Sequence, residues 1–595
     1  MKIGLELHQR LDTNKLFCNC SSKLDDEEPN LTLVRRLHPV FSELGEIDEA
    51  SRIEYTKRKV FEYQVFRNNN CLVETDEEPP HPLNLEALKT VLNIALQLHA
   101  SPVDEVHIMR KMVIDGSNTS GFQRTAIIAL DGHLDTPKGL VRISTMALEE
   151  ESAGIVSASS SKTTYRLDRL GIPLIEITTA PDIKDADHLK EVAEKLGMIL
   201  RATGKVARGL GTVRQDVNIS TGGGARVEIK GAQDLKTLPL LVETEQKRQL
   251  ELVKILAELR QRKAIPIKKH AKDVTDIFKK TEAKLIKNSL DSGAFVLAQK
   301  LQNHAGILGK QIQKGKRYGT ELSDYAKLAG VKGIIHSDES LSKYGISESE
   351  EKALREGLHA KEEDAFVLIV APKEQANKAM DHVIFRANMD FVPEETRRAN
   401  PDGTTNFMRP LPGRARLYPE TDIPPVPVTK EFLSSIEKTE SLDEKQHKLE
   451  KMLNKEMANK IIRSRHLHLF ERIVETGADP MLVATTIENT IISLRREGVE
   501  FKDLEEPLLE LFEEYAKGTF VKAAIPDVLK FMAKGARVEA ILKVYRLQKI
   551  TSKDLEKLVI QNSYDMKTVM QKYRLQVDPQ EVAEIIKKKR HSEYV

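Results

Sequence analysis

Tryptophan is absent from this 595-residue chain, aromatic residues make up only 5% of it, and there are only three cysteines. Three cysteines cannot build a disulfide framework, so we expect a protein of a reducing compartment, the cytoplasm. Apolar runs such as AFVLIVAP from Ala365 are far too short to span a bilayer. Met1 leads directly into a strand-like pattern, so no signal peptide is expected. The sequence therefore argues against secreted disulfide scaffolds and membrane-spanning proteins.

A strong charge of one sign is also missing. The formal net charge is only +2, although 31% of the residues are charged. Any binding to nucleic acid must therefore depend on a local patch of cations. With 40% hydrophobic residues, the composition is that of a globular protein. The chain is too long for a single core, and about three to four domains are expected.

Two common phosphate-binding signatures are lacking as well. No G-x-x-x-x-G-K-[ST] motif occurs, and no G-x-G-x-x-G follows a strand-like segment. Nucleotide chemistry of the P-loop or Rossmann kind is therefore not expected.

The first part of the chain, to about residue 260, reads as mixed α/β, with short alternating apolar segments and long loops rich in glycine and proline. Helical spacing predicts helices near residues 84–98, 185–203 and 239–263. Residues 265–390 have the strand and helix order of a separate α+β unit. A segment rich in proline and glycine follows, and from about residue 428 the pattern is helical to the end.

The opening stretch MKIGLELHQRL alternates like a half-buried strand. Ile3, Leu5 and Leu7 point to one face, whereas Glu6 and His8 point to the other. Such polar residues are often simply solvated. The alternative is that the carboxylate and the imidazole are half of a metal site, because this pair of ligands suits a divalent ion such as Mg²⁺.

Two downstream segments supply candidates for the other half. ALEEESAG places Glu149, Glu150 and Glu151 after a strand-like run, and PLIEITT places Glu176 in an otherwise apolar strand. An unpaired carboxylate in such a strand is costly to bury. We expect no lysine beside these acids, so a cation that gathers them would make the arrangement tolerable.

A third segment carries alternating charges on two strands. The glycine-rich stretch TGGGAR at residues 221–226 reads as a hairpin turn. One predicted arm holds Arg214 and Asp216, and the other holds Arg226, Glu228 and Lys230. These charges are more than solvation requires, and we expect them to face a phosphate and its metal ion.

Several long motifs then resemble one family. GLELHQRLDTNKLFC, LEEESAG, LDRLGIPLIEITTAPDI, GLGTVRQDVNIS and GGARVEIKG match, in order and spacing, the cradle domain of the B/E-type subunits of tRNA-dependent amidotransferases. The loop IDGSNTSGFQRT and the segment NPDGTTNFMRPLPGRARLYPETDIPP resemble the E-type branch, known from the archaeal glutamyl-tRNA(Gln) enzymes. Residues 265–390 resemble the extra domain of bacterial aspartyl-tRNA synthetases.

The resemblance implies a multidomain α/β protein. It implies a mixed α+β cradle at residues 1–264 and 391–430, with the aspartyl-tRNA-synthetase-like α+β domain inserted at residues 265–390. An all-α helical domain with a tRNA-binding tail is expected at residues 431–595. We expect the insert to contact tRNA and help select it. The tail should bind RNA through basic clusters at Ile461–His468, Lys517–Lys530 and Ile585–Arg590, although solvated helix faces explain them equally well.

For chemistry, the resemblance implies an ATP-dependent carbon–nitrogen ligase that uses glutamine as amido donor. ATP and Mg²⁺ would serve to phosphorylate the side-chain carboxylate of glutamate on tRNA(Gln), and ammonia would then displace phosphate. The implied metal ligands are Glu6, His8, Glu150 and Glu176. Arg214, Asp216 and Lys230 are expected to be catalytic with them, and Glu149, Arg226 and Glu228 to contact the nucleotide.

The same resemblance implies partners. The chain has no G-x-S-x-G elbow and no Cys–His amidase pattern, so ammonia should come from the D-type amidotransferase subunit, an asparaginase-like amidase. A heterodimer or heterotetramer that acts on Glu-tRNA(Gln) is expected. Arg214, Asp216, Glu228 and Lys230 are candidates for lining an ammonia channel. The rival interpretation is a non-catalytic tRNA-binding scaffold for the amidase; aminoacylation is disfavoured because H-I-G-H and K-M-S-K-S signatures are absent.

The cysteines depart from the family pattern. Cys18, Cys20 and Cys71 resemble part of the C-x-C plus C-x-x-C zinc knuckle of some B-type relatives, but the fourth cysteine is missing. His38 or Asp76 could complete a tetrahedral zinc site. We expect three reduced, partly buried thiols rather than a zinc site.

Overall fold

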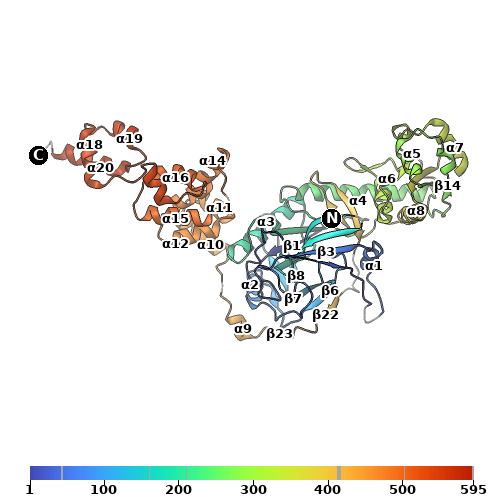
Figure 1. Cartoon of the computed structure of the whole chain (residues 1–595), viewed down its shortest axis with the longest axis horizontal. Helices are drawn as coiled ribbons and strands as arrows, with labels where there is room; N and C mark the ends of the chain where they lie inside the picture. Colours follow the sequence, from blue (N-terminus) through green and yellow to red (C-terminus); the bar gives the residue numbers. More distant parts are fainter. Residues whose placement is uncertain are drawn as a thin grey trace. The chain divides into compact units, whose positions relative to one another are not determined.

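The computed structural model of the chain describes residues 1–41, 45–159, 161–209, 211–411, 417–437, 439–501 and 503–592. It divides into two compact units (Figure 1). One unit comprises Met1–Gly197 and Lys205–Lys438, and the other comprises Met198–Gly204 and Thr439–Val595. Among the helices in these ranges, none combines the length and the apolar character that crossing a membrane requires.

An eleven-stranded sheet forms the centre of the first unit, and β1 lies in its interior. Along the sheet the strands follow the order β21-β20-β13-β12-β1-β11-β8-β7-β6-β22, with β4 paired to β7. Their bounds are β1 Lys2–Arg10, β4 Ser101–Pro102, β6 Met109–Met112, β7 Phe122–Leu134, β8 Val141–Glu150, β11 Pro173–Thr179, β12 Val213–Ser220, β13 Val227–Lys230, β20 Glu395–Ala399, β21 Thr405–Pro410 and β22 Leu417–Pro419.

The predicted alternation of the first strand is confirmed. Ile3, Leu5 and Leu7 are completely buried, whereas Glu6 and His8 are half-buried. Since β1 pairs on both sides, with β11 and with β12, side chains of these two strands flank Glu6 and His8 on the same face of the sheet.

Three helices expected in the first part are also confirmed. They are α2 at Leu85–Gln97, α3 at Ala186–Ala202 and α4 at Leu238–Gln261. Asn84 caps α2, because its side chain accepts hydrogen bonds from the backbone N–H groups of Glu86 and Ala87. The predicted hairpin is formed by β12 and β13, which pair antiparallel across the glycine-rich turn.

A second, four-stranded sheet in this part has the order β2-β3-β10-β9. Its strands are β2 Leu31–Arg35, β3 Val60–Val65, β9 Gly154–Ala158 and β10 Lys162–Arg166, and helix α1 at Glu49–Thr56 precedes β3. The short strands β5 Glu105–Val106 and β23 Val426–Pro427 pair with each other, and the short helix α9 spans Lys430–Ser434.

Residues 265–390 form the expected α+β segment. A sheet of order β14-β15-β19-β18 is accompanied by four helices and by a small β16–β17 ribbon. The bounds are β14 Lys272–Asp273, α5 Lys284–Asp291, β15 Phe295–Leu301, β16 Gln311–Gln313, β17 Lys316–Arg317, α6 Tyr318–Ala326, β18 Ile335–His336, α7 Glu348–Leu358, β19 Ala365–Ala371 and α8 Lys373–Ala387.

This insert is not a self-contained module. The C-terminal half of α4 contributes Leu252, Ile255, Leu256 and Leu259 to the hydrophobic core that includes α6, β19 and α8. Replacing residues 265–390 with a flexible linker would therefore expose an apolar helix face. The hydrophobic core of the insert therefore extends beyond residue 265 into α4.

A buried ion network also joins the insert to its surroundings. Glu321 of α6 contacts Arg248 of α4 at 3.0 Å and Arg397 of β20 at 3.1 Å, and it lies 3.5 Å from Arg386 of α8. Glu245 and Glu395 complete a set of three acids and three arginines, all at most 2% exposed. Burial opposes ionisation of Glu321, but the arginines lower its pKa to about 2.

The second unit is helical, as expected. One apolar cluster joins the helices from α10 to α17, and a separate small cluster joins α18, α19 and α20. The bounds are α10 Leu442–Met452, α11 Lys455–Arg463, α12 Leu467–Glu475, α13 Pro480–Thr485, α14 Ile491–Arg496, α15 Glu505–Ala516, α16 Ile525–Met532, α17 Val538–Val544, α18 Ser552–Gln561, α19 Met566–Tyr573 and α20 Pro579–Ser592.

Some cations of the predicted RNA-binding clusters have acidic partners. Lys517 pairs with Glu514 at 2.6 Å, and Lys530 pairs with Glu497 at 3.0 Å. The side chains of the last two residues of Ile585–Arg590 lie outside the described set, as do residues 412–416 of the segment rich in proline and glycine.

Candidate functional site

The polar face of β1 is extended by its two neighbouring strands. His8 pairs with Glu176 of β11 on one side and with Arg214 of β12 on the other, and Glu6 pairs with Asp216 of β12. Side chains of directly paired residues lie on the same face of a sheet. The register therefore gathers residues from three segments that are far apart in the sequence.

One group of possible metal ligands consists of His8, Glu149 and Glu176. Each offers one ligand atom, and these atoms all lie within 4.8 Å of one another. His8 Nε2 is 3.5 Å from Glu176 Oε2. Glu149, near the end of β8, also accepts a hydrogen bond of 2.7 Å from Lys111 Nζ of β6.

A second group lies next to it and consists of Glu6, Asp216 and Glu228, again with ligand atoms within 4.8 Å. Here a lysine is already present. Lys230 Nζ lies 2.7 Å from Asp216 Oδ2 and 2.6 Å from Glu228 Oε1. Asn218 Nδ2 donates to Glu6 Oε1 at 2.8 Å.

The crowding of carboxylates changes their protonation. Burial, and then the charges of Glu176 and Glu228, raise the pKa of Glu6 to about 7. Burial acts the same way on Glu176, but its contact with His8 outweighs burial and lowers its pKa to about 2. Burial alone would lower the pKa of His8, yet the Glu176 carboxylate raises it. The face thus carries a local excess of negative charge.

Glu150 does not join this group. Successive residues of a strand point to opposite faces, and Glu150 pairs with Pro173 while Glu149 pairs with Leu174. The Glu150 carboxylate accepts a hydrogen bond of 2.8 Å from the backbone N–H of Arg124 and lies 3.6 Å from the Arg124 guanidinium. Burial raises its pKa. Among the described residues, it is therefore Glu149, not Glu150, whose carboxylate lies with His8 and Glu176.

Two further expectations need correction. The sequence predicted no lysine beside Glu149, Glu150, Glu151 and Glu176, but Lys111 contacts Glu149 at 2.7 Å, because a neighbouring strand brings this distant cation to the same face. Arg226, expected at the nucleotide, is exposed at the turn before β13 and is not among the residues that line the cavity described below.

A cavity of about 580 Å³ opens over this face. His8, Glu149, Arg214, Asp216 and Lys230 line it. The Arg214 guanidinium is held by the buried Glu151 carboxylate, 2.9 Å away. Acids, cations and an imidazole therefore share one open space.

Other residues of the cavity could not be recognised in the sequence. Lys111 and Gln123 reach Glu149 from β6 and β7, and Leu328 from the insert and Met408 of β21 form part of the wall. No motif marks any of these positions, and only the strand order brings them here.

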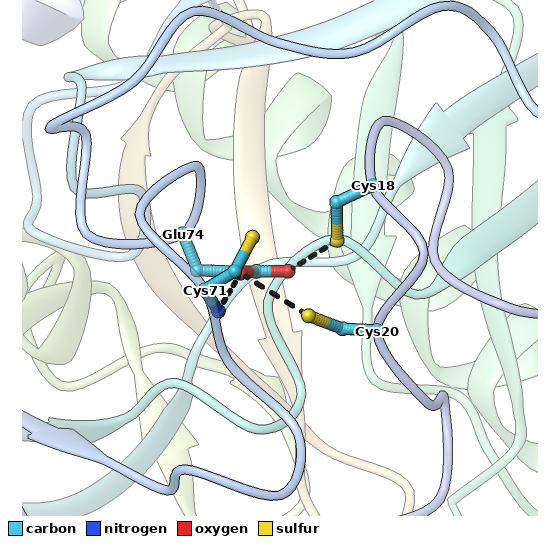
Figure 2. Close-up of side chains that lie close together, drawn as sticks. All are labelled: Cys18, Cys20, Cys71 and Glu74. Atoms are coloured by element: carbon cyan, nitrogen blue, oxygen red, sulfur yellow. Dashed lines mark hydrogen bonds between the residues drawn. The ribbon is translucent and has the colours of Figure 1, made fainter.

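The three cysteines meet elsewhere, in a cluster with Glu74 (Figure 2). Cys18 Sγ donates to Glu74 Oε1 at 2.8 Å, and Cys20 Sγ lies 4.0 Å from Glu74 Oε2. Their mutual contact raises the pKa of Cys18 and lowers that of Cys20 to about 7. The fourth member is neither His38 nor Asp76, because Asp76 pairs with Arg35 and His38 is exposed.

Comparison with known proteins places these features in a family. The model of the GatB/GatE catalytic domain matches residues 1–434. A Methanocaldococcus jannaschii protein named as the E subunit of glutamyl-tRNA(Gln) amidotransferase is 47% identical, over 94% of this chain and 91% of its own length. Proteins of the same name from Pyrococcus furiosus (47% identical, over 94% and 90%) and Methanosarcina barkeri (46%, over 90% and 86%) are also similar.

Proposed function

This chain belongs to the GatB/GatE family, and on that basis we propose that it is the E-type subunit of a glutamyl-tRNA(Gln) amidotransferase. In that role it converts glutamate attached to tRNA(Gln) into glutamine. The proposal extends to the chemistry: the chain uses ATP to activate the glutamate side chain, and a partner amidase of the D type supplies ammonia.

Activation is required by the chemistry of the substrate. A carboxylate is a poor electrophile, because oxide would have to leave. Transfer of the γ-phosphoryl group of ATP to a carboxylate oxygen releases ADP and provides phosphate as the leaving group. Ammonia then forms the C–N bond, the C–O bond to phosphate breaks, and the nitrogen loses a proton to give the neutral amide.

The residues of the sheet face fit a magnesium ion. His8, Glu149 and Glu176 offer one imidazole nitrogen and two carboxylates within 4.8 Å of one another. The carboxylates suit Mg²⁺, and the imidazole adds a nitrogen ligand for a divalent ion. A Mg²⁺ ion held by these residues would neutralise charge on the phosphates of ATP. Glu6 adds a further carboxylate from the same strand, two residues before His8.

Lys230 makes the second acidic group different. Its ammonium lies between Asp216 and Glu228 at salt-bridge distances, which is where a second ion would otherwise bind. We therefore propose one metal ion per site, with Lys230 as the fixed neighbouring cation. Lys230 and Arg214 face the cavity and are placed to bind anionic oxygens during phosphoryl transfer.

The observation that carries this proposal is the open cavity over a sheet face where imidazole, carboxylates and lysine converge. A pure RNA-binding scaffold has no use for such a constellation. The test is ATP hydrolysis that depends on both Mg²⁺ and Glu-tRNA(Gln), measured with the full-length chain and its partner amidase.

In that assay Glu176→Gln should lower ATP hydrolysis by about 10²–10³-fold, the cost of losing one transition-state contact. Glu105→Gln, on a carboxylate that is 51% exposed, is the matched control and should behave as wild type. Glutamine hydrolysis by the amidase should persist in both complexes. Near-wild-type ATP hydrolysis by Glu176→Gln would refute the assignment.

A further inference from the structure

A third group of potential metal ligands lies outside the proposed catalytic cavity, where two loops meet. Cys18 and Cys20 lie in the loop that follows β1, and Cys71 and Glu74 lie in the loop that follows β3. One ligand atom from each of the four lies within 4.8 Å of the others. Figure 2 shows the Cys18 and Cys20 sulfurs directed at the Glu74 carboxylate.

Glu74 stands where a fourth cysteine would stand in a C-x-x-C pair, because it follows Cys71 by three residues. Its orientation is fixed locally: Glu74 Oε2 accepts a hydrogen bond of 2.8 Å from the backbone N–H of Cys71. On the other side, Thr119 Oγ1 donates to the Glu74 backbone carbonyl at 2.8 Å. The carboxylate is thus held inside the cluster rather than turned to solvent, and the residue is only 3% exposed.

The spacing of the four atoms suits a tetrahedral ion. Bonds of about 2.3 Å to sulfur require ligand atoms roughly 3.8 Å apart, and the atoms here lie within 4.8 Å of one another. The Cys18 Sγ–Glu74 Oε1 distance of 2.8 Å would lengthen and the longer separations would shorten, so small adjustments of the two loops complete the site. All four positions would be protein ligands, which is the arrangement of a structural site rather than of a catalytic one.

Charge is also balanced. Three thiolates and one carboxylate carry four negative charges, of which a divalent ion cancels two. Lys15 Nζ lies 3.1 Å from Glu74 Oε1 and is fully buried, so it cancels a third. A buried lysine beside a ligand carboxylate also orients that ligand, as contacts around metal sites commonly do.

We propose that Cys18, Cys20, Cys71 and Glu74 bind one zinc ion that fastens the loop after β1 to the loop after β3. Sulfur ligands select zinc over magnesium or calcium, and the carboxylate disfavours copper(I). Our expectation of three metal-free thiols depended on the lack of a fourth ligand, and Glu74 supplies that ligand. Because the four residues lie outside the catalytic cavity, zinc binding here does not depend on the proposed reaction.

The structure also shows how the four residues are arranged in the alternative, metal-free state. Without an ion, the Glu74 carboxylate is satisfied by Lys15, by the Cys18 thiol and by the Cys71 backbone. The two states differ in measurable ways: a zinc site contains stoichiometric metal and protects its thiols, whereas the metal-free state contains three thiols that react with a thiol reagent without delay.

The first experiment measures zinc by mass spectrometry in the full-length chain purified without chelator. We expect one zinc per chain, thiols that react only after a strong chelator is added, and, after exchange with cobalt(II), a thiolate-to-cobalt charge-transfer band. A chain that holds no zinc and takes up no cobalt with such a band would overturn the proposal.

Variants assign the ligands. Cys71→Ser should weaken the charge-transfer band and lower zinc affinity at least tenfold, and Glu77→Gln, a neighbouring acid paired with Arg35, should keep full zinc content. A neutral residue at position 74 would leave the Lys15 charge buried without a counter-charge. The decisive variant is therefore Glu74→Cys, whose thiolate is negatively charged when it binds zinc. It should retain one zinc and show a stronger thiolate band with cobalt; an unchanged band would show that residue 74 is not a ligand.

Discussion

Neutralising the centre of the buried ion network should loosen the insert selectively. The variant is Glu321→Gln, which keeps the size of the side chain and removes its charge. In the native protein the Glu321 carboxylate forms ion pairs with three arginines, at 3.0, 3.1 and 3.5 Å, and its side chain is 2% exposed. After the change, three buried arginines share only Glu245 and Glu395.

Breaking a buried ion pair by removing one partner costs about 3–5 kcal/mol, mainly because a charge is left buried and uncompensated. Three arginines lose a partner here, so a cost within that range applies to the local opening of α6 and α8. Since a free-energy change of about 1.4 kcal/mol corresponds to a factor of ten, the open population of these helices should rise by roughly 10²–10³-fold.

Native-state hydrogen exchange on the full-length chain measures this opening helix by helix. The control is Glu374→Gln, also in the insert, whose pair with Lys378 is 84% and 66% exposed and should contribute little to stability because solvent screens it. Adding Arg397→Met to Glu321→Gln restores equal numbers of acids and arginines and should recover part of the loss. If Glu321→Gln accelerates exchange no more than Glu374→Gln does, the network does not hold the insert.

Three other predictions follow from the same structure. With Mn²⁺ as a substitute for Mg²⁺, Glu149→Gln should weaken metal binding at least tenfold, measured by calorimetry, whereas Glu150→Gln should leave it unchanged. The reverse result would make Glu150 the ligand. Lys230→Met should raise the Mn²⁺ stoichiometry from one to two per chain, and a stoichiometry that stays at one would contradict the role given to this lysine. Burial lowers the pKa of His304, so the folded insert disfavours its protonation and should lose stability as the pH falls below about 6.5. The difference in melting temperature between pH 7.5 and pH 5.5 should be smaller for His304→Gln than for the wild type. An equal difference would show that this histidine does not cause the loss of stability.

The parts of the fold that depend on local pattern were predictable. Strict alternation in residues 3–8 predicted which face of β1 is polar, and helical spacing predicted α2, α3 and α4 to within two residues. A glycine run between two charged, alternating arms predicted the β12–β13 hairpin. In each case the signal lies within a few neighbouring residues.

The error at Glu149 and Glu150 shows where such patterns fail. Three consecutive glutamates end a strand, and their faces depend on which residue of β11 each one pairs with. A shift of one residue reverses every face, and both β8 interfaces contain irregular register. Sequence alone therefore identified the cluster but not the member that faces the cavity.

Long-range partners were invisible for a different reason. Arg248, Glu321 and Arg397 lie far apart in the chain, and nothing in their local sequence predicts that they meet. Glu74 is an intermediate case: its spacing of three residues from Cys71 was a usable signal, but a glutamate in place of a cysteine is easy to overlook.

Helix α4 has a mechanical consequence. Its 24 residues, Leu238–Gln261, make a rod of about 36 Å. The C-terminal half packs in the core of the insert at Leu252 and Leu259, and the middle of the helix is hydrogen-bonded to the sheet at Gln249. There the Gln249 side chain donates to the carbonyl of Ile219 and accepts from the N–H of Thr221, at the end of β12. A helix attached to both the insert and the sheet moves them together as one rigid element. A force on the insert would therefore also act on the strand that carries Arg214 and Asp216, and a displacement of the insert would strain the face where His8, Glu149 and Glu176 meet.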